Sequence, residues 1–241
     1  MTMDTDALLI TVQSHGARFF SIAKQYPDAP IPACPDWKMS NLVGHVGVIY
    51  GGIGDLLKAG ITDRPSTPFP TPPNRDLHGW AQNNLYTMLD LFASREPEHP
   101  IWTWGKEQTV GWLARRMTHE TLVHMWDAET VTSEHLPVDS DLANDGIDEF
   151  IEGPLQFSSN LNRKFSYPTG SLHLHRTDGE GEWLLEPSSD GLTVAHVHAK
   201  GDVAVRGTSM KLLLYLWGRH PEGLQIFGDE KLAVEWGNQA P

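Results

Sequence analysis

Four long stretches in which apolar residues recur at helical spacing constrain the fold of this chain more than any other feature. They lie at about residues 4–26, 40–57, 76–95 and 109–131. Prolines follow the first stretch, and the proline-rich segment 62–74 separates the second from the third. Each stretch is longer than a strand and is bounded by residues that break helices. Four such stretches predict a four-helix bundle.

Glycines are unusually frequent in the second stretch. They are poor helix formers, so each one weakens an isolated helix. They are compatible with a helix where a neighbouring helix or a ligand approaches the backbone closely. The positions are Gly44, Gly47, Gly51, Gly52 and Gly54.

The pattern changes near residue 165, after a shorter helix expected at about 140–152. The segments "SLHLHRT" and "EWLLEP" flank "DGEG", which predicts a hairpin. "GLTVAHVHA" and "DVAVRG" flank a "KG" turn, and "LQIFG" and "KLAVEWG" also predict strands. "SMKLLLYLWGR" interrupts them with a helix-like apolar run.

These patterns predict an α+β protein of two domains. We expect residues 1–160 to form the helical bundle and residues 161–241 to form a small domain with a mostly antiparallel sheet.

The composition excludes several classes of function. The net charge of −13 argues against a nucleic-acid surface or an anionic-membrane surface. The lone cysteine cannot form an internal disulfide, and neither a signal peptide nor a membrane span of roughly 20 apolar residues is expected. We therefore expect a soluble cytoplasmic protein with small-molecule partners, whose oligomeric state the sequence does not set.

The segment "HETLVH" in the fourth helix carries candidate metal ligands. Glu120 and His124 are four residues apart, so their side chains share one helix face. His119 and His124 are five apart and diverge by about 140°, which makes them poor co-ligands. The spacing also differs from the H-E-x-x-H motif of metalloproteases.

A catalytic zinc site usually has three protein ligands and one open position. His45, between Gly44 and Gly47 in the second helix, is the best third ligand. Bundles often build metal sites from facing helices. By spacing alone, however, a Glu–His pair arises easily by chance, and a lone helical histidine is usually a surface or satisfied core residue.

Two motifs resemble the mycothiol-dependent maleylpyruvate isomerase family, a branch of the DinB-like metal-binding bundles. They are "CPDWKMSNLVGHVG" and "RRMTHETLVHMWDAE", and "GTSMKLLLYLWGRHPEGLQIFGD" resembles the sterol-carrier-like domain that follows the bundle. The resemblance implies a DinB-like bundle with zinc held by His45, Glu120 and His124, and mycothiol as thiol cosubstrate. It also implies an arginine from the second domain at the site, for which Arg219 is the first candidate and Arg206 the second.

The predicted function is a zinc-dependent isomerase or S-transferase. A metal lowers the pKa of a bound thiol, and the thiolate can add to a small, acidic electrophile. The alternatives are a non-catalytic ligand-binding protein, a hydrolase whose metal activates water, and a regulatory protein without turnover. The sequence does not distinguish isomerisation from transfer or name the substrate.

Other residues have two interpretations each. Asp127 can orient His124 or be a surface acid, and Cys34 can be a nucleophile or a packed residue near a helix start. Arg115 and Arg116 can also bind a carboxylate. The tryptophans of "IWTWG" and Trp112 can line a substrate cleft or belong to the core.

The pairs "HLH" and "HVH" are a further candidate metal site. Their members share one strand face by the two-residue period, and neighbouring strands would bring four imidazoles together. An exposed polar sheet face is the ordinary alternative. The residues are His173, His175, His196 and His198.

Overall fold

The computed structural model of the chain describes residues 3–132, 134–156 and 166–240. Its contacts divide the chain into two compact units. The first unit runs to Thr103 and again from Glu107 to Leu136; the second contains Trp104–Lys106 and the chain from Pro137 onward. The predicted domain boundary at residue 160 lies outside the described residues and stays a prediction.

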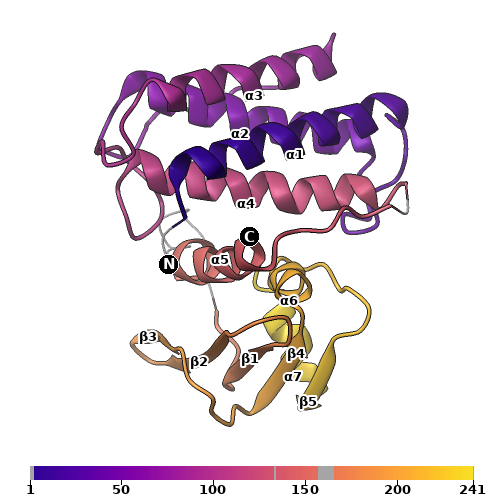
Figure 1. Cartoon of the computed structure of the whole chain (residues 1–241), viewed down its shortest axis with the longest axis vertical. Coiled ribbons are helices and arrows are strands. Elements are labelled where there is room, and N and C mark those ends of the chain that lie inside the picture. Colours follow the sequence, from indigo (N-terminus) through magenta and orange to yellow (C-terminus); the bar gives the residue numbers. More distant parts are fainter. Residues whose placement is uncertain (1–2, 133, 157–165, 241) are drawn as a thin grey trace. The chain divides into compact units, whose positions relative to one another are not determined.

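The first unit is a bundle of four long helices that lie alongside one another (Figure 1). They are α1 (Thr5–Gln25), α2 (Met39–Ala59), α3 (Leu77–Ala93) and α4 (Val110–Glu129). The periodicity therefore predicted all four helices. Two begin at side-chain caps: Asp76 accepts from the backbone N–H of Gly79, and Thr109 accepts from that of Trp112.

The glycines of α2 permit close packing against α3, as the high frequency of glycine in this stretch suggested. A Cβ atom at Gly47 would lie 2.5 Å from the Trp80 ring and 2.7 Å from the Ala81 side chain. No larger residue fits there unless α3 moves. Gly47 therefore sets the distance between the two helices on the same turn of α2 that carries His45.

α4 differs from an ordinary amphipathic helix because nearly every residue in it is buried. Burial extends to polar groups, including Thr118, His119 and Glu120. Thr118 and Thr121 donate their hydroxyl hydrogens to backbone carbonyls one turn earlier, which satisfies them inside the bundle. A helix buried all round can present catalytic or metal-binding groups away from water.

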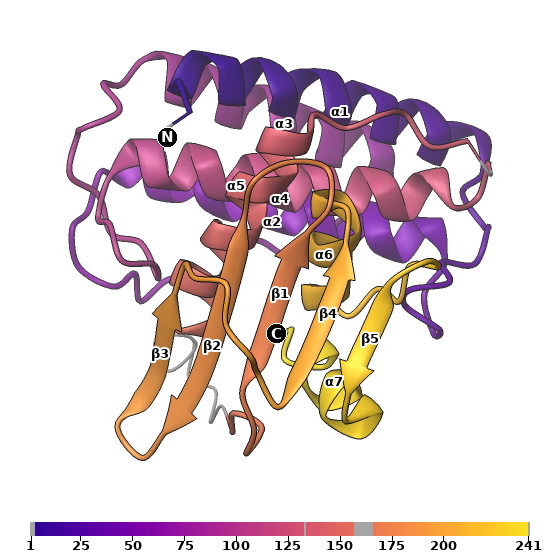
Figure 2. The same ribbon diagram turned by 60° about the horizontal axis from the view of Figure 1, so that its bottom comes forward.

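The second unit begins with α5 (Ser140–Phe150), which continues into a short π-helical turn at Ile151–Leu155. A mixed sheet follows, with strand order β3-β2-β1-β4-β5 and one parallel pair, β1–β4 (Figure 2). Its strands are β1 (Leu172–Arg176), β2 (Glu182–Ser188), β3 (Gly191–Ala195), β4 (Val203–Gly207) and β5 (Gln225–Gly228). The predicted hairpin of β1 and β2 and the mostly antiparallel pairing are confirmed.

Two local predictions in this unit are wrong. The "KG" segment is not a turn between paired strands, because β3 pairs with β2 while β4 lies beside β1. "KLAVEWG" forms the helix α7 (Glu230–Gly237). Asp229 caps that helix by accepting from two backbone N–H groups, and Leu232, Ala233 and Trp236 form its buried face. The helix-like run before it forms α6 (Ser209–Leu216).

The two faces of the sheet have different chemistry. Alternate residues of β1, β2 and β4 are apolar and buried: Leu172, Leu174, Trp183, Leu185, Val203 and Val205. By strand alternation, His173, His175, Glu182 and Arg206 lie on the other face. Within the described residues, no helix is long and apolar enough to cross a bilayer.

Arg176 and Asp178 fasten the β1–β2 turn to the start of α6. The buried Arg176 guanidinium donates to Asp178 and to Asp141 of α5. Asp178 also accepts from the backbone N–H and the hydroxyl of Ser209, at 2.9 Å each. Burial alone would raise the pKa of Asp178, but the bonds from Ser209 and Arg176 lower it below its ordinary value.

Asp178→Ala should lower the free energy of unfolding by about 1.5–3 kcal/mol, the usual effect of losing hydrogen bonds to a charged group. Because the folded pKa of Asp178 is depressed, its stabilisation is present above the unfolded pKa of about 3.9 and lost as pH falls through the folded value. Urea denaturation across a pH series measures both effects. Asp190→Ala, in an exposed turn, is the matched control, and an equal loss in both variants would contradict this role.

Candidate metal centre

Glu120 and His124 of α4 and His45 of α2 converge on one point. His124 Nε2 lies 3.2 Å from Glu120 Oε1, and His45 Nε2 lies 3.3 Å from the same oxygen. The two imidazole rings have centroids 4.9 Å apart. All three donor atoms lie within 4.8 Å of one another. The four-residue spacing on α4 and the packing of α2 against α4 thus bring together the three residues singled out in the sequence.

The three side chains differ in their access to solvent. Glu120 and His124 are 9% and 10% exposed, whereas His45 is 34% exposed. A small molecule can therefore approach the cluster from the side of His45. His119, although buried in the same helix, lies outside this cluster, as its spacing predicted.

Glu120 uses its two oxygens for different partners. Oε1 faces the imidazoles, while Oε2 accepts from the buried guanidinium of Arg116, one turn earlier on α4. Burial on its own would raise the pKa of Glu120, but Arg116 and His124 hold that pKa well below its ordinary value. The carboxylate therefore stays ionised inside the bundle and can bind a cation.

Asp127 orients His124. Its carboxylate is fully buried, and its Oδ2 accepts from His124 Nδ1 at 2.9 Å. Burial would lower the pKa of His124, but Glu120 and the hydrogen bond to Asp127 raise it. A proton held on Nδ1 leaves Nε2, on the side of Glu120 and His45, as the nitrogen that a metal ion would bind.

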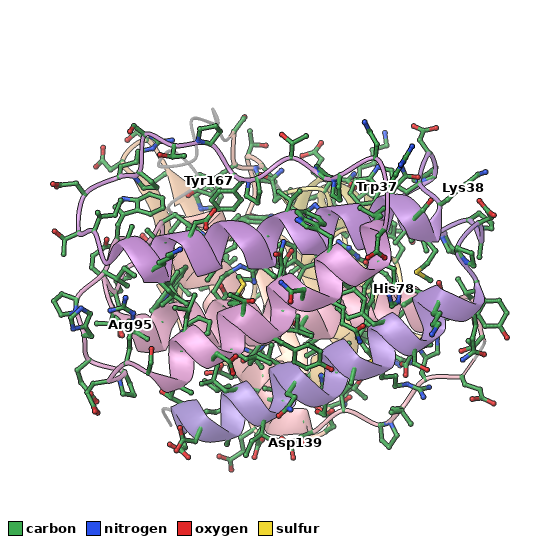
Figure 3. The ribbon with its side chains drawn as sticks, turned by 90° about the horizontal axis from the view of Figure 1, so that it is seen from above. Trp37, Lys38, His78, Arg95, Asp139 and Tyr167 are labelled. Carbon is green, nitrogen blue, oxygen red and sulfur yellow. The ribbon has the colours of Figure 1, made fainter. Side chains whose placement is uncertain are left out.

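Two neighbours of the centre were not assigned these roles from the sequence. Arg116 was considered only as a substrate anchor, but its burial against Glu120 makes it a partner of a ligand. Trp37, which precedes α2 (Figure 3), places its ring 5.4 Å from that of His45. The i, i+4 spacing of Arg116 and Glu120 was a readable signal, whereas Trp37 stood in the "CPDWKMSNLVGHVG" motif without a role of its own.

The cysteine, tryptophan and arginine candidates from the sequence lie outside the cluster of three donor residues. Cys34 lies in a turn before α2: its N–H donates to the Ile31 carbonyl, and its own carbonyl accepts from the N–H of Trp37. Trp112 is buried in the bundle, as a core residue would be. Arg219 lies in the second unit and donates to the Trp217 carbonyl. Arg206 is exposed on β4. A part for either arginine at the metal centre stays a prediction.

The predicted four-histidine cluster of the second unit has a different membership. His173, His175 and His198 come together with Glu182, and the donor atoms of these four residues also lie within 4.8 Å of one another. His196 is not a member; its Nε2 lies 3.8 Å from an Asp148 oxygen.

The donor set of the bundle fits a divalent metal such as zinc. Two imidazoles and one carboxylate are common zinc ligands, and three protein ligands leave a coordination position for a further group. The hydrogen bond to Asp127 and the ion pair to Arg116 fix the orientations of His124 and Glu120.

Comparisons with known proteins agree with this fold. The family model described as the mycothiol maleylpyruvate isomerase N-terminal domain matches residues 16–129, which include all three donor residues. Two crystal structures, of a mycothiol-dependent maleylpyruvate isomerase and of its histidine-to-alanine mutant, share the fold with TM-scores of 0.60 and 0.59. The identities are 13% and 12%, and 93% of each chain is covered. No curated protein sequence matches the chain.

Asp127→Asn should weaken metal binding about 10- to 100-fold, the usual cost of losing a carboxylate that orients a ligand histidine. The substitution keeps the shape of the side chain and removes its charge. Competition with a chromophoric zinc chelator measures the affinity. Asp55→Asn, at an exposed position of α2, should leave it unchanged. Equal affinities of the Asp127 variant and the parent would show that this hydrogen bond does not support the site.

Proposed function

We propose that this chain, which through residues 16–129 belongs to the mycothiol maleylpyruvate isomerase N-terminal domain family, is a metal-dependent enzyme that uses a low-molecular-weight thiol against a small electrophile. The metal is zinc and the thiol is mycothiol. The reaction is isomerisation of the electrophile or transfer of the sulfur to it.

The observation that carries this proposal is the convergence of three donor atoms: Glu120 Oε1, His124 Nε2 and His45 Nε2. Imidazole and carboxylate ligands suit zinc, and three of them leave room for an exogenous ligand. When bound, such a metal lowers the pKa of a coordinated thiol, so that the thiolate is available near neutral pH.

The residues of the chain prepare the site for this chemistry. Asp127 keeps the proton of His124 on Nδ1, and Arg116 keeps Glu120 ionised and oriented. His45 is the most exposed donor, so the thiol and the electrophile approach from its side. The fixed buried charges need little rearrangement during the reaction, which is how an enzyme gains from a preorganised site.

The two reactions differ only in the fate of the sulfur. Addition of the thiolate to an activated C=C bond leaves a single bond that can rotate. Loss of the same sulfur then restores the alkene in the other geometry, with no net change in atoms. Retention of the sulfur, with protonation of the adjacent carbon, gives a conjugate instead.

The His45→Ala/His124→Ala variant should bind one zinc ion fewer per chain than the parent protein and lose the thiol-dependent consumption of an electrophile such as maleylpyruvate. Without two of its three ligands the site cannot hold the metal. Elemental analysis and an assay with and without mycothiol measure the two losses. His99→Ala/His220→Ala removes two histidines elsewhere and should change neither.

The same assay separates the other functions. Turnover of model esters or amides without thiol would indicate a hydrolase. Binding of an apolar ligand with no turnover and no zinc in the parent protein would indicate a non-catalytic binding protein. Either result would overturn the proposed enzyme.

Arg219→Ala should raise the KM for a carboxylate substrate about 10- to 100-fold, because a hydrogen bond to a charged group contributes roughly 1.5–3 kcal/mol. The neutral methyl ester of that substrate should respond much less, which distinguishes charge recognition from general damage. Arg206→Ala is the second candidate, and Lys231→Ala is the control. If only Arg206→Ala has the effect, Arg206 is the anchor; if neither does, the second unit does not supply it.

A further inference from the structure

The sheet of the second unit carries a second set of metal-type donors. We propose that His173, His175, Glu182 and His198 bind a divalent metal ion of the zinc class, and that this ion fastens residues 196–202 to the sheet. This site is separate from the bundle centre and independent of the proposed enzymatic function. Its ligands come from β1, from β2 and from the segment between β3 and β4.

The strand register brings the first three ligands together. His175 of β1 pairs with Glu182 of β2, and His173 lies two residues before His175 on the same face. His173 Nε2 lies 2.9 Å from Glu182 Oε2, and His175 Nδ1 lies 3.0 Å from Oε1. The sheet alone therefore positions two imidazoles around one carboxylate.

His198 supplies the fourth ligand from outside the strands. Its Nδ1 lies 2.7 Å from Oε2 and 3.0 Å from Oε1 of Glu182. The three imidazole centroids form a nearly equilateral triangle with sides of 5.7, 6.0 and 6.2 Å. Each ring directs one nitrogen at the same carboxylate, which is the convergence a metal ion requires.

The size of the cluster suits a tetrahedral ion. With metal–nitrogen bonds of about 2.0–2.1 Å, neighbouring ligand atoms lie about 3.3 Å apart. The donor atoms lie within 4.8 Å of one another, and the closest pairs are already nearer than the tetrahedral spacing. Small side-chain rotations would therefore open a central position among the four.

The charges around the cluster favour a cation. Within the described part of the chain, the ion pairs of Glu182 are all with these three imidazoles. Glu182 and His198 also line a surface hollow of about 430 Å³ together with the acidic Asp148 and Glu180, which gives an ion a path from solvent. Arg206, opposite His175 on β4, is a cation on this face and is exposed.

The course of the chain explains why a fastening is useful there. β3 and β4 run in the same direction with β2 and β1 between them, so residues 196–202 must pass across both of those strands (Figure 2). The register places Ala195, Leu184, His173 and Ala204 in one row, so the crossing spans about three strand spacings, roughly 15 Å. Eight residue steps can reach roughly 26–29 Å, so the segment has slack that a bond to the sheet would restrain.

The segment forms no helix or strand, and its other contacts lie toward its two ends. Asp202 accepts from the backbone N–H and the hydroxyl of Ser171, at 2.8 Å each. At the other end, the ring centroid of His196 lies 6.1 Å from that of Trp183. His198, in the middle, is 80% exposed and contacts Glu182. A metal bond from His198 would join the middle of the crossing to the two central strands.

Three imidazoles and one carboxylate suit zinc better than the harder ions magnesium and calcium. Four protein ligands make a closed site, as in structural zinc centres, whereas the bundle centre has three ligands and an open position. The two sites therefore differ in role: the first can bind a reactant, and the second holds the chain.

The full-length His45→Ala/His124→Ala variant isolates the second site. After zinc loading and dialysis, it should retain about one zinc per chain by elemental analysis. Addition of Glu182→Gln or His198→Ala should remove that zinc, with an affinity loss larger than the roughly 10- to 100-fold expected for an outer-sphere group. His196→Ala, in the same segment but outside the cluster, should retain it.

Cobalt substitution and hydrogen exchange test the geometry and the role. The variant loaded with Co²⁺ should show the intense visible absorption of a tetrahedral ion, and zinc should slow amide exchange in residues 196–202. His198→Ala should abolish both effects. Because His198 is exposed, its replacement should not unfold the protein, so the loss would report on the metal site. No zinc in the isolating variant, or equal losses in the His196→Ala and His198→Ala variants, would overturn the proposal.

Discussion

The bundle depends on a carboxylate that it buries. Glu120 is almost fully enclosed, and a lone charge there would be strongly unfavourable. Arg116 compensates one oxygen, and two imidazoles face the other. Removal of one partner from a buried ion pair typically costs about 3–5 kcal/mol. The packing of α2 against α4 and the chemistry of the site are therefore linked through the same side chain.

This linkage explains why α4 departs from the usual surface helix. An amphipathic helix places polar groups in water, but α4 buries them and satisfies several of them within the helix itself. Thr118 and Thr121 bond to carbonyls of their own helix, and Asp127 bonds to His124. Burying polar groups costs free energy, which the hydrogen bonds between them offset. The same bonds hold the groups in fixed orientations, as a binding centre requires.

Much of the bundle could be predicted because its signals are local. Helical periodicity fixed the four helices, and the four-residue spacing of Glu120 and His124 fixed their common face. Trp37 could not be assigned to the centre, because its contact with His45 depends on how the chain enters α2. The role of Arg116 was also missed: its four-residue spacing from Glu120 places both on one helix face, but the spacing does not reveal that the pair is buried.

The second unit was harder because strand pairing is not local. "KLAVEWG" alternates like a strand, yet the cap at Asp229 and the close spacing of its buried residues select a helix. The two residues of "KG" resemble a hairpin turn, but β1 already has β2 on one side and takes β4 on the other. No pattern within residues 191–207 contains that information.

The same non-local pairing changes what the histidines of this unit can do. A hairpin would have kept His196 and His198 together on one strand face, two residues apart. The crossing instead separates them: His198 reaches the carboxylate of Glu182, and His196 lies near Asp148. A carboxylate thus replaces the fourth imidazole, which gives the cluster a negative charge to oppose that of a bound cation. The topology, rather than the spacing of the histidines, determines that ligand set.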